Sequence, residues 1–250
     1  MPARRERIDK LLVDRGLLPS RDRAQRLILA GSVLVDGWRI DKPGTQVLHD
    51  ASIEVRGNDI PFVSRGGIKL AGALDHWQID VTGKVGIDIG ASTGGFTDCL
   101  LQRGARRVIA IDVGYGQLAW SLRQDPRVTL FERANIRRFD RSLLPEPGDL
   151  AVIDVSFISL ELVLPTAIPL LRPGGTLLPM VKPQFEVGKG EVGAGGVVRD
   201  PKLREKAVDR IRCAAQALGL RCEGQFESPL PGPKGNIEVF LRLILPEGGR

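Results

Sequence analysis

Short apolar runs alternate with helical patterns over most of this chain, and that alternation restricts the possible folds strongly. Runs rich in Val, Ile and Leu predict buried strands at residues 85–89, 107–112, 128–131, 150–155, 176–182 and 237–244. Helical patterns occupy 160–171 and, most clearly, 201–218, which begins with Pro and stops before Gly219. Strands that alternate with helices predict an α/β fold with a doubly wound, largely parallel sheet.

A glycine-rich turn follows the first of these strands. The strand runs into Asp88-Ile-Gly-Ala-Ser-Thr-Gly-Gly-Phe96, where glycine allows a sharp turn and a close approach to a ligand. The spacing differs from Gly-x-Gly-x-x-Gly, and no Gly-x-x-x-x-Gly-Lys-Ser/Thr motif occurs, so a P-loop is excluded. Asp112 ends the second strand, where a carboxylate can accept both hydroxyls of an adenosyl ribose. This combination fits an adenosyl ligand such as S-adenosylmethionine, although Asp88 would also suit a helix cap.

Four charged residues lie at or near apolar strands, in the order Lys69, Asp154, Lys182 and Glu238. Asp154 and Lys182 end predicted strands, and Glu238 opens the last one. A charge embedded in such a strand is costly unless it is paired. Parallel sheets of this kind bind ligands at the carboxyl ends of their strands. The four residues therefore predict a functional site, with a structural ion-pair network as the alternative.

The first 57 residues follow a different and more basic pattern, with 11 Lys and Arg against 8 Asp and Glu. Two short helices are expected, one around Ile8–Leu12 and one that begins at an N-cap on Ser20. A hairpin through Asp36-Gly37 and a strand at 52–55 should follow. This order predicts a small α+β domain.

The run Asn58-Asp59-Ile60-Pro61 is polar and punctuated by proline, which predicts a linker. The expected organisation is thus a small domain at 1–57, a linker at 58–63 and a larger domain at 64–250.

Composition excludes several classes of function. Three Cys in no metal-ligand spacing, together with two His, argue against a disulfide scaffold, and no metal is expected. No apolar run follows the basic first residues, and residues 155–171 carry Glu161 and two prolines. We therefore expect a cytoplasmic protein with no signal peptide and no membrane partner. The sequence leaves the oligomeric state open.

Several motifs resemble known families. The helix, Ser-Arg…Ala…Leu-Ile, Gly-x-Val-x-Val-Asp-Gly and strand order resembles the small RNA-binding domain first seen in a ribosomal small-subunit protein. The run Asp-Ile-Gly-Ala-Ser-Thr-Gly-Gly-Phe-Thr and the later Lys, Asp, Lys and Glu resemble ribose 2′-O-methyltransferases of the FtsJ type, whose sheet is Rossmann-like. Together with Ser-Arg-Gly-Gly-Ile-Lys, the chain resembles the TlyA (haemolysin A-like) family over nearly its whole length.

The resemblance implies methyl transfer from S-adenosylmethionine to the ribose 2′-hydroxyl of cytidine in ribosomal RNA, with ribosomal subunits as partners. We expect Lys182 to be the central catalytic residue, with Asp154 and Glu238 setting its charge and position and Lys69 orienting the ribose or phosphate. The expected cofactor-binding residues are Asp88, Gly90, Ser92, Gly94, Gly95, Phe96, Asp112, Asn135 and Asp154. The expected RNA-binding residues are Arg4, Arg7, Arg21, Arg23, Arg26 and Arg65.

Alternatives to this prediction stay open. A non-catalytic RNA-binding or ribosome-assembly protein would keep only a vestigial site, which the intact glycine turn and the four charged residues disfavour. A membrane-active haemolysin, the activity behind the family's older name, lacks support from any apolar segment. Asn135 is nearly as well explained as a turn residue, and the arginines as a solvated helix face.

Overall fold

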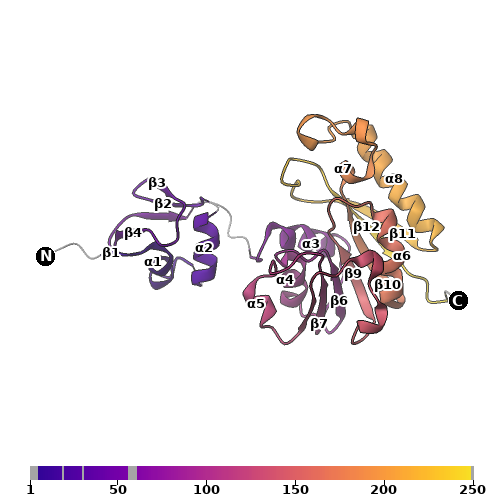
Figure 1. Ribbon diagram of the computed structural model, residues 1–250, viewed down its shortest axis with the longest axis horizontal. Helices are drawn as coiled ribbons and strands as arrows, with labels where there is room; N and C mark the ends of the chain where they lie inside the picture. Colours follow the sequence, from indigo (N-terminus) through magenta and orange to yellow (C-terminus); the bar gives the residue numbers. More distant parts are fainter. Residues whose placement is uncertain (1–4, 19, 30, 56–60, 249–250) are drawn as a thin grey trace. The chain divides into compact units, whose positions relative to one another are not determined.

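The computed structural model describes residues 5–18, 20–29, 31–55 and 61–248, and the chain divides into two compact units, Met1–Asp59 and Ile60–Arg250 (Figure 1). Each unit has a hydrophobic core of its own. Part of the predicted linker, 58–60, lies outside the described residues. Phe62 is buried in the larger unit, and the Val63 amide donates a hydrogen bond to Asp98 of that unit. The larger unit therefore begins before residue 64, and the predicted linker extends too far.

The small unit contains the two predicted helices and the predicted hairpin. Ser20 Oγ accepts a hydrogen bond from the Arg23 amide, which confirms the expected helix cap. Asp36 and Gly37 both have positive φ, at 50° and 83°, as a tight two-residue hairpin requires. The helices are α1 (Ile8–Asp14) and α2 (Arg21–Leu29), and the strands are β1 (Arg5–Arg7), β2 (Val33–Val35), β3 (Trp38–Ile40), β4 (Gln46–Leu48) and β5 (Ile53–Val55).

In the small unit β2 pairs with β3 and β5, and β1 pairs with β4, all antiparallel. The sequence pattern missed β1 and β4, and β1 in particular is Arg-Glu-Arg, which has no apolar residue to indicate a strand. One apolar cluster, which includes Ile8, Leu11 and Ile28, packs the helices against the strands.

The larger unit is built on a seven-stranded sheet with the order β11-β12-β10-β9-β6-β7-β8. The five strands from β8 to β10 are parallel, and β12 runs antiparallel to both of its neighbours. This arrangement confirms the largely parallel sheet. The strands are β6 (Val85–Ile89), β7 (Arg107–Ile111), β8 (Val128–Phe131), β9 (Gly148–Ile153), β10 (Leu171–Val181), β11 (Arg221–Glu227) and β12 (Val239–Ile244).

Helices cover both faces of this sheet (Figure 1). One core lies under α3 and α4, and the other lies under α6 and α8. Successive strand residues face opposite cores, so Val108 packs into one and Ile109 into the other. The helices are α3 (Arg65–His76), α4 (Gly95–Gln102), α5 (Trp120–Arg123), α6 (Leu164–Ala167), α7 (Pro183–Glu186) and α8 (Pro201–Ala217). The 3₁₀ turns are η1 (Ile136–Arg138), η2 (Arg141–Leu143), η3 (Leu160–Leu162), η4 (Ile168–Leu170), η5 (Lys189–Glu191) and η6 (Ala194–Gly196).

Two expectations for this unit were wrong in detail. The predicted helix at 160–171 is divided into η3, α6 and η4, because Pro165 and Pro169 each lack the amide that a continuous helix needs. The strand predicted from 176 begins at Leu171. Sequence patterns also missed β11, a polar edge strand, and α3, whose N-cap Ser64 accepts a hydrogen bond from the Gly66 amide. The helix predicted at 201–218 is confirmed as α8.

Candidate active site

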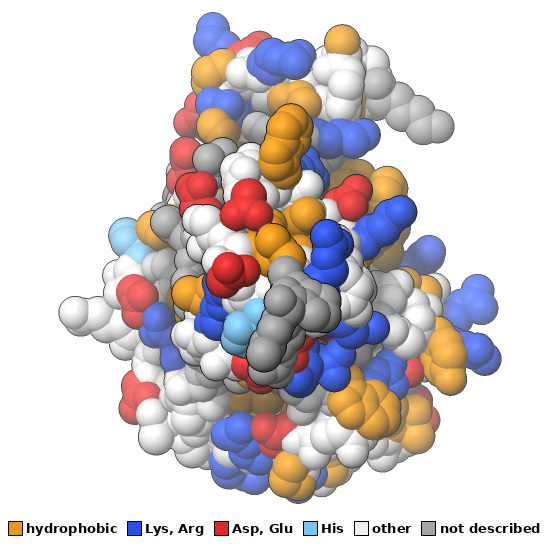
Figure 2. All heavy atoms as spheres, turned by 90° about the vertical axis from the view of Figure 1, so that its left-hand side faces the viewer, with side chains coloured by type: hydrophobic (Ala, Val, Ile, Leu, Met, Phe, Trp, Pro, Cys, Tyr) orange, Lys and Arg blue, Asp and Glu red, His pale blue; other side chains and the backbone are white. Residues whose placement is uncertain are grey.

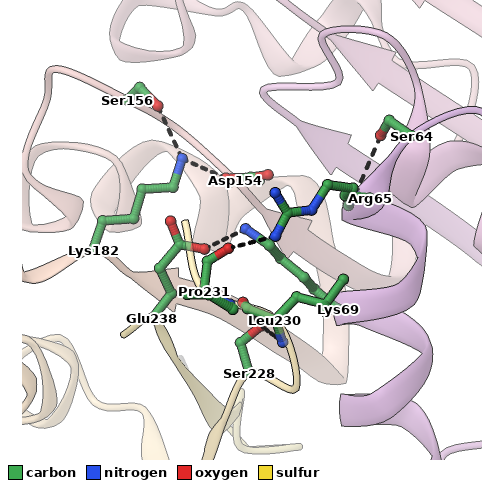
Figure 3. Close-up of polar contacts among 11 residues, drawn as sticks. Ser64, Arg65, Lys69, Asp154, Ser156, Lys182, Ser228, Leu230, Pro231 and Glu238 are labelled. Atoms are coloured by element: carbon green, nitrogen blue, oxygen red, sulfur yellow. Dashed lines mark hydrogen bonds and ion pairs between the residues drawn. The ribbon is translucent and has the colours of Figure 1, made fainter. Parts of the chain in front are cut away.

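Asp154 and Lys182 meet at the carboxyl ends of two neighbouring parallel strands. Asp154 follows β9 and Lys182 follows β10, so the sheet itself brings them together. Lys182 Nζ lies 2.6 Å from Asp154 Oδ1 and donates a hydrogen bond of 2.9 Å to Ser156 Oγ (Figure 3). The Lys182 side chain is only 11% exposed, whereas that of Asp154 is 25% exposed. The ammonium group is thus held by two oxygens at the edge of solvent.

Lys69 and Glu238 form a second ion pair from more distant parts of the chain. Lys69 lies on α3 and Glu238 directly precedes β12, and Lys69 Nζ donates a hydrogen bond to Glu238 Oε2. Both side chains are almost completely buried. Because removal of either partner would leave a buried charge without compensation, the pair fixes α3 to the sheet at this point.

The two ion pairs share their surroundings. A cavity of about 410 Å³ extends from Lys182 and Asp154 to the glycine-rich turn after β6. A second cavity of about 420 Å³ lies on the other side of the same charged residues, toward Glu238 and Asn236. Lys69, Asp154 and Lys182 line both cavities. The predicted catalytic residues therefore lie together, between two hollows at the carboxyl ends of the strands.

The glycine-rich turn forms one wall of the first cavity. Gly90 has a φ of 87°, and a Cβ atom there would lie 2.5 Å from the backbone oxygen of Asp154. Gly94 has a φ of 99° and is the N-cap of α4. A Cβ on Gly95 would collide with Ser64 Oγ at the start of α3. Glycine is required here because the turn packs closely against β9 and α3 while its backbone stays open to the cavity.

Asp112 ties this turn to the end of β7. Its carboxylate accepts hydrogen bonds from the Ser92 amide, at 2.7 Å, and from the Gly114 amide, at 2.6 Å. Ser92 itself has a φ of 48°, a backbone conformation that needs such support. Asp112 therefore lies at the strand end predicted for it, outside the lining of the first cavity, and Ser92 lies in the glycine-rich turn and lines that cavity.

Asp88 lies beneath the turn and does not line the cavity. Its side chain is fully buried, and Oδ2 accepts hydrogen bonds from the amide and hydroxyl of Thr97 in the first turn of α4. Burial raises the pKa of Asp88 to about 7, because water no longer solvates the carboxylate. The structure places Asp88 as a helix-capping acid, the alternative that the sequence had left open.

Phe96 and Asn135, the remaining predicted cofactor residues, differ in their environments. Phe96 is buried and lines the first cavity, and the centroid of its ring lies 5.9 Å from that of Phe240. Asn135 is exposed, and its Oδ1 accepts a hydrogen bond of 3.0 Å from the Arg137 amide. Asn135 thus caps the turn η1, as the alternative prediction had it.

A known family model matches each of the two units. The family model of the FtsJ-like methyltransferases matches residues 62–244, which span the sheet, the glycine-rich turn and both ion pairs. The chain belongs to the FtsJ-like methyltransferase family. The model of the S4 domain matches residues 6–53 in the small unit.

Relatives of this FtsJ-like chain match it over nearly its full length. It is 51% identical over 242 residues to the 16S/23S rRNA (cytidine-2′-O)-methyltransferase TlyA of Mycobacterium tuberculosis, covering 96% of this chain and 90% of that protein. It is 39% identical to Hemolysin A of Brachyspira hyodysenteriae, covering 96% and 100%. A solved structure named as a hemolysin, from Streptococcus thermophilus, is 41% identical with a TM-score of 0.76, covering 97% and 89%. Within the described residues, no helix is long and apolar enough to cross a membrane.

Sequence reasoning missed two serines of the FtsJ-like site. Ser156 contacts Lys182, and Ser64 both caps α3 and lines the first cavity. A single serine in a loop belongs to no spaced motif. The available signals were the position of Ser156 two residues after Asp154 and that of Ser64 directly before Arg65. Gln184, directly after Pro183, lines the second cavity and was also missed.

The predicted RNA-binding arginines are dispersed over both units. Arg7 and Arg21 are about half exposed and both contact Asp9, whereas Arg23 is only 9% exposed and offers little surface to a partner. Arg65 is exposed beside the first cavity and donates a hydrogen bond to the Pro231 carbonyl. Arg4 and the side chain of Arg26 lie outside the described residues. Figure 2 shows many Lys and Arg side chains on the face in view, with acidic side chains among them.

Proposed function

We propose that this protein transfers a methyl group from S-adenosylmethionine to the ribose 2′-hydroxyl of cytidine in ribosomal RNA, in the cytoplasm. The observation that carries the proposal is the cavity that connects the glycine-rich turn to the Lys182–Asp154 pair. The name of the relative from Mycobacterium tuberculosis states this reaction for 16S and 23S rRNA. In our proposal the small unit, 1–57, docks the RNA, and residues 64–250 carry the transfer.

The residues around the turn fit S-adenosylmethionine. Gly90 and Gly95 let the turn pack against neighbouring protein atoms with which a Cβ would collide, and both line the first cavity, so a ligand can lie against the backbone of the turn. The Asp112 carboxylate, held at the end of β7, would accept the ribose hydroxyls. Asp88 would act indirectly, by capping α4 below the turn. When bound, S-adenosylmethionine supplies a methyl group that its sulfonium has already activated.

In this proposal Lys182 acts on the ribose hydroxyl. That hydroxyl is a poor nucleophile and loses its proton as it attacks, so a group within hydrogen-bond reach must orient it or accept the proton. Asp154 and Ser156 hold the Lys182 ammonium from two sides, which leaves one direction, toward the cavities, for a substrate oxygen. Positioning of this kind contributes much of the rate in a single in-line transfer.

Lys69 and Arg65 would serve the RNA backbone next to the reacting ribose. Lys69 lines both cavities while its charge stays paired with Glu238. Arg65 is exposed at the rim of the first cavity. A fixed lysine and an exposed arginine on one helix, α3, suit a phosphate group that enters from solvent.

The first experiment incubates the protein with methyl-labelled S-adenosylmethionine and unmodified ribosomal subunits, small and large separately, and then digests the RNA to nucleosides. We expect label in 2′-O-methylcytidine, and a loss of about 10²–10⁴-fold in kcat for Lys182→Ala with unchanged cofactor affinity by calorimetry. Lys84→Ala, at an exposed lysine that lines neither cavity, is the matched control.

The outcomes separate the alternatives. Label on a base, or full activity of Lys182→Ala, would contradict the proposal. A protein that binds ribosomal subunits but no S-adenosylmethionine would be a non-catalytic RNA-binding protein. Lys182→Arg keeps the positive charge but cannot accept a proton, so retained turnover would assign Lys182 to orientation and lost turnover to proton transfer.

A further inference from the structure

Asp9 is a fully buried carboxylate near the surface of the small unit. It lies on α1 and accepts hydrogen bonds from Arg7 Nε and Nη2, both at 3.0 Å. Arg21 Nη2 and Gln25 Nε2, from α2, each donate to the same oxygen, Oδ2, at 3.0 Å. One buried acid thus collects four donors from two segments of the chain.

The two arginines keep most of their donors and about half of their surface. Arg7 is 47% exposed and Arg21 is 54% exposed, while Asp9 between them has no exposure. Each guanidinium carries five N–H groups, and Asp9 engages two of Arg7 and one of Arg21. Because both Nη2 atoms contact one oxygen, the two cations lie side by side with a net charge of +1 for the three residues.

Two other basic residues of the small unit, Lys10 and Arg15, serve internal contacts. Lys10 pairs with Glu6 and Asp14 on its own side of α1. The Arg15 guanidinium donates to the backbone oxygens of His49 and Ala51. In contrast, Arg7 and Arg21 meet over a residue that is expensive to bury, since taking a carboxylate out of water costs several kcal/mol before its partners compensate.

We propose that Asp9 is a positioning residue, which holds Arg7 and Arg21 as a ready-made pair for one backbone phosphate of RNA. An arginine loses rotamer freedom when it binds, and fixing it beforehand removes part of that loss from the binding step. A phosphate presents several oxygens to such a pair, and charge-assisted bonds of this kind are strong. The inference rests on the proposed function, in that it takes RNA as the ligand of the small unit.

The test separates the effect of losing a negative charge from the effect of releasing the two arginines. Asp9→Asn removes a negative charge, which by itself should strengthen RNA binding, but it also releases the two arginines. Asp14→Asn also removes one negative charge from the same helix, but at a half-exposed acid that contacts Lys10. It is therefore the matched control. We expect Asp9→Asn to bind a short labelled RNA duplex at least about fivefold more weakly, and Asp14→Asn to bind as tightly as the original protein or more tightly.

The full chain is used, with binding measured by fluorescence anisotropy over a range of salt concentrations. We expect the slope of log affinity against log salt to fall by about one for Asp9→Asn, as one phosphate contact is lost. In an Arg7→Gln, Arg21→Gln background, Asp9→Asn should cause no further loss, whereas a merely structural role would lower affinity there as well. The Arg7→Gln, Arg21→Gln protein also shows whether the two arginines bind RNA. If its RNA affinity equalled that of the original protein, the proposal would be overturned.

Two results would overturn the role of Asp9 without touching the catalytic proposal. One is an Asp9→Asn protein that binds RNA like Asp14→Asn. The other is an Asp9→Asn loss of equal size in the double-arginine background. Conversely, failure of the labelled-methyl assay with the expected RNA-binding results would remove the methyl-transfer proposal and leave Asp9 as the positioning residue of an RNA-binding unit.

Discussion

Asp9 in the small unit and Asp88 in the larger unit are both completely buried, yet their surroundings act on them in opposite directions. The Arg7 guanidinium, with help from Gln25 and Arg21, holds the pKa of Asp9 well below its usual range. Among the described residues, Thr97 alone donates to the carboxylate of Asp88, and burial raises the pKa of Asp88 to about 7. Neither carboxylate is exposed, but Asp9 lies close to the surface of its unit beside two guanidinium groups, whereas Asp88 lies deep in its unit, so depth and the neighbouring cations together decide the charge.

The paired acids of the larger unit extend this comparison. Glu238 is as buried as Asp9, but its partner Lys69 is buried with it, whereas the partners of Asp9 remain half in solvent. An exposed cation can meet a phosphate that arrives from water. A buried one acts only on a group that has already entered the cavity. A carboxylate–cation pair therefore fits the docking that we propose for one unit and the catalysis that we propose for the other.

The largest effect should come from breaking the buried Lys69–Glu238 pair. Lys69→Met leaves Glu238 buried without a cation, and we expect the free energy of unfolding of the larger unit to fall by about 3–5 kcal/mol in chemical denaturation. Lys69→Met combined with Glu238→Leu should recover most of that loss while activity stays absent. If the single and double variants were equally unstable, the pair would not be the reason for the loss.

The pH dependence of stability should distinguish the two buried aspartates. Folded Asp88 keeps its proton up to about pH 7, while the unfolded chain releases it near the ordinary value of 3.8. Between these values the folded state binds more protons, so Asp88 lowers the free energy of unfolding as the pH rises. The stability of Asp88→Asn relative to the original protein should therefore rise over this window, by up to about 1.4 kcal/mol per pH unit, and level off above it.

Asp9→Asn is the natural control for this titration. Because the pKa of Asp9 is lowered in the folded state, its contribution is complete above the ordinary value and is lost only in stronger acid. The destabilisation caused by Asp9→Asn should be constant from pH 5 to pH 7 in thermal unfolding. A slope for Asp9→Asn, or a flat difference for Asp88→Asn, would reverse the comparison.

The smallest effect concerns an exposed acid, Asp200, which caps α8 by accepting a hydrogen bond from the Lys202 amide. Asp200 is exposed, and no cation among the described residues forms an ion pair with it. Its stabilising contact is the hydrogen bond from an amide of the first helical turn. Asp200→Ala should lower the free energy of unfolding by about 1 kcal/mol, and Asp200→Ser should restore most of it. A loss as large as that of Lys69→Met would mean that exposure does not separate these acids.

Local patterns predicted much of this molecule. The strand ends at Asp154 and Lys182 were predicted from apolar runs, because a charge directly after such a run marks the edge of a sheet. The glycine-rich turn was predicted because its backbone conformation depends on a few adjacent residues. Helix α8 was predicted from its proline start, its spacing and Gly219.

Long-range packing decided the rest. Asp88 lies near the end of β6 and Asp112 directly after β7, yet one caps α4 under the turn and the other supports Ser92. Arg7, Arg21 and Arg23 carry the same charge in the sequence, but two share Asp9 at the surface and the third is buried. The contacts of Lys182 with Ser156 and of Lys69 with Glu238 join residues far apart in the chain.

The sequence by itself determined the alternation of strands and helices in the larger unit, the glycine-rich turn after β6 and the charged residues at the ends of strands. Only the tertiary structure decided which acid met which cation and which acid met none. The physical reason is that propensity and periodicity act between near neighbours, whereas the energy of a charge depends on every atom that replaces its water.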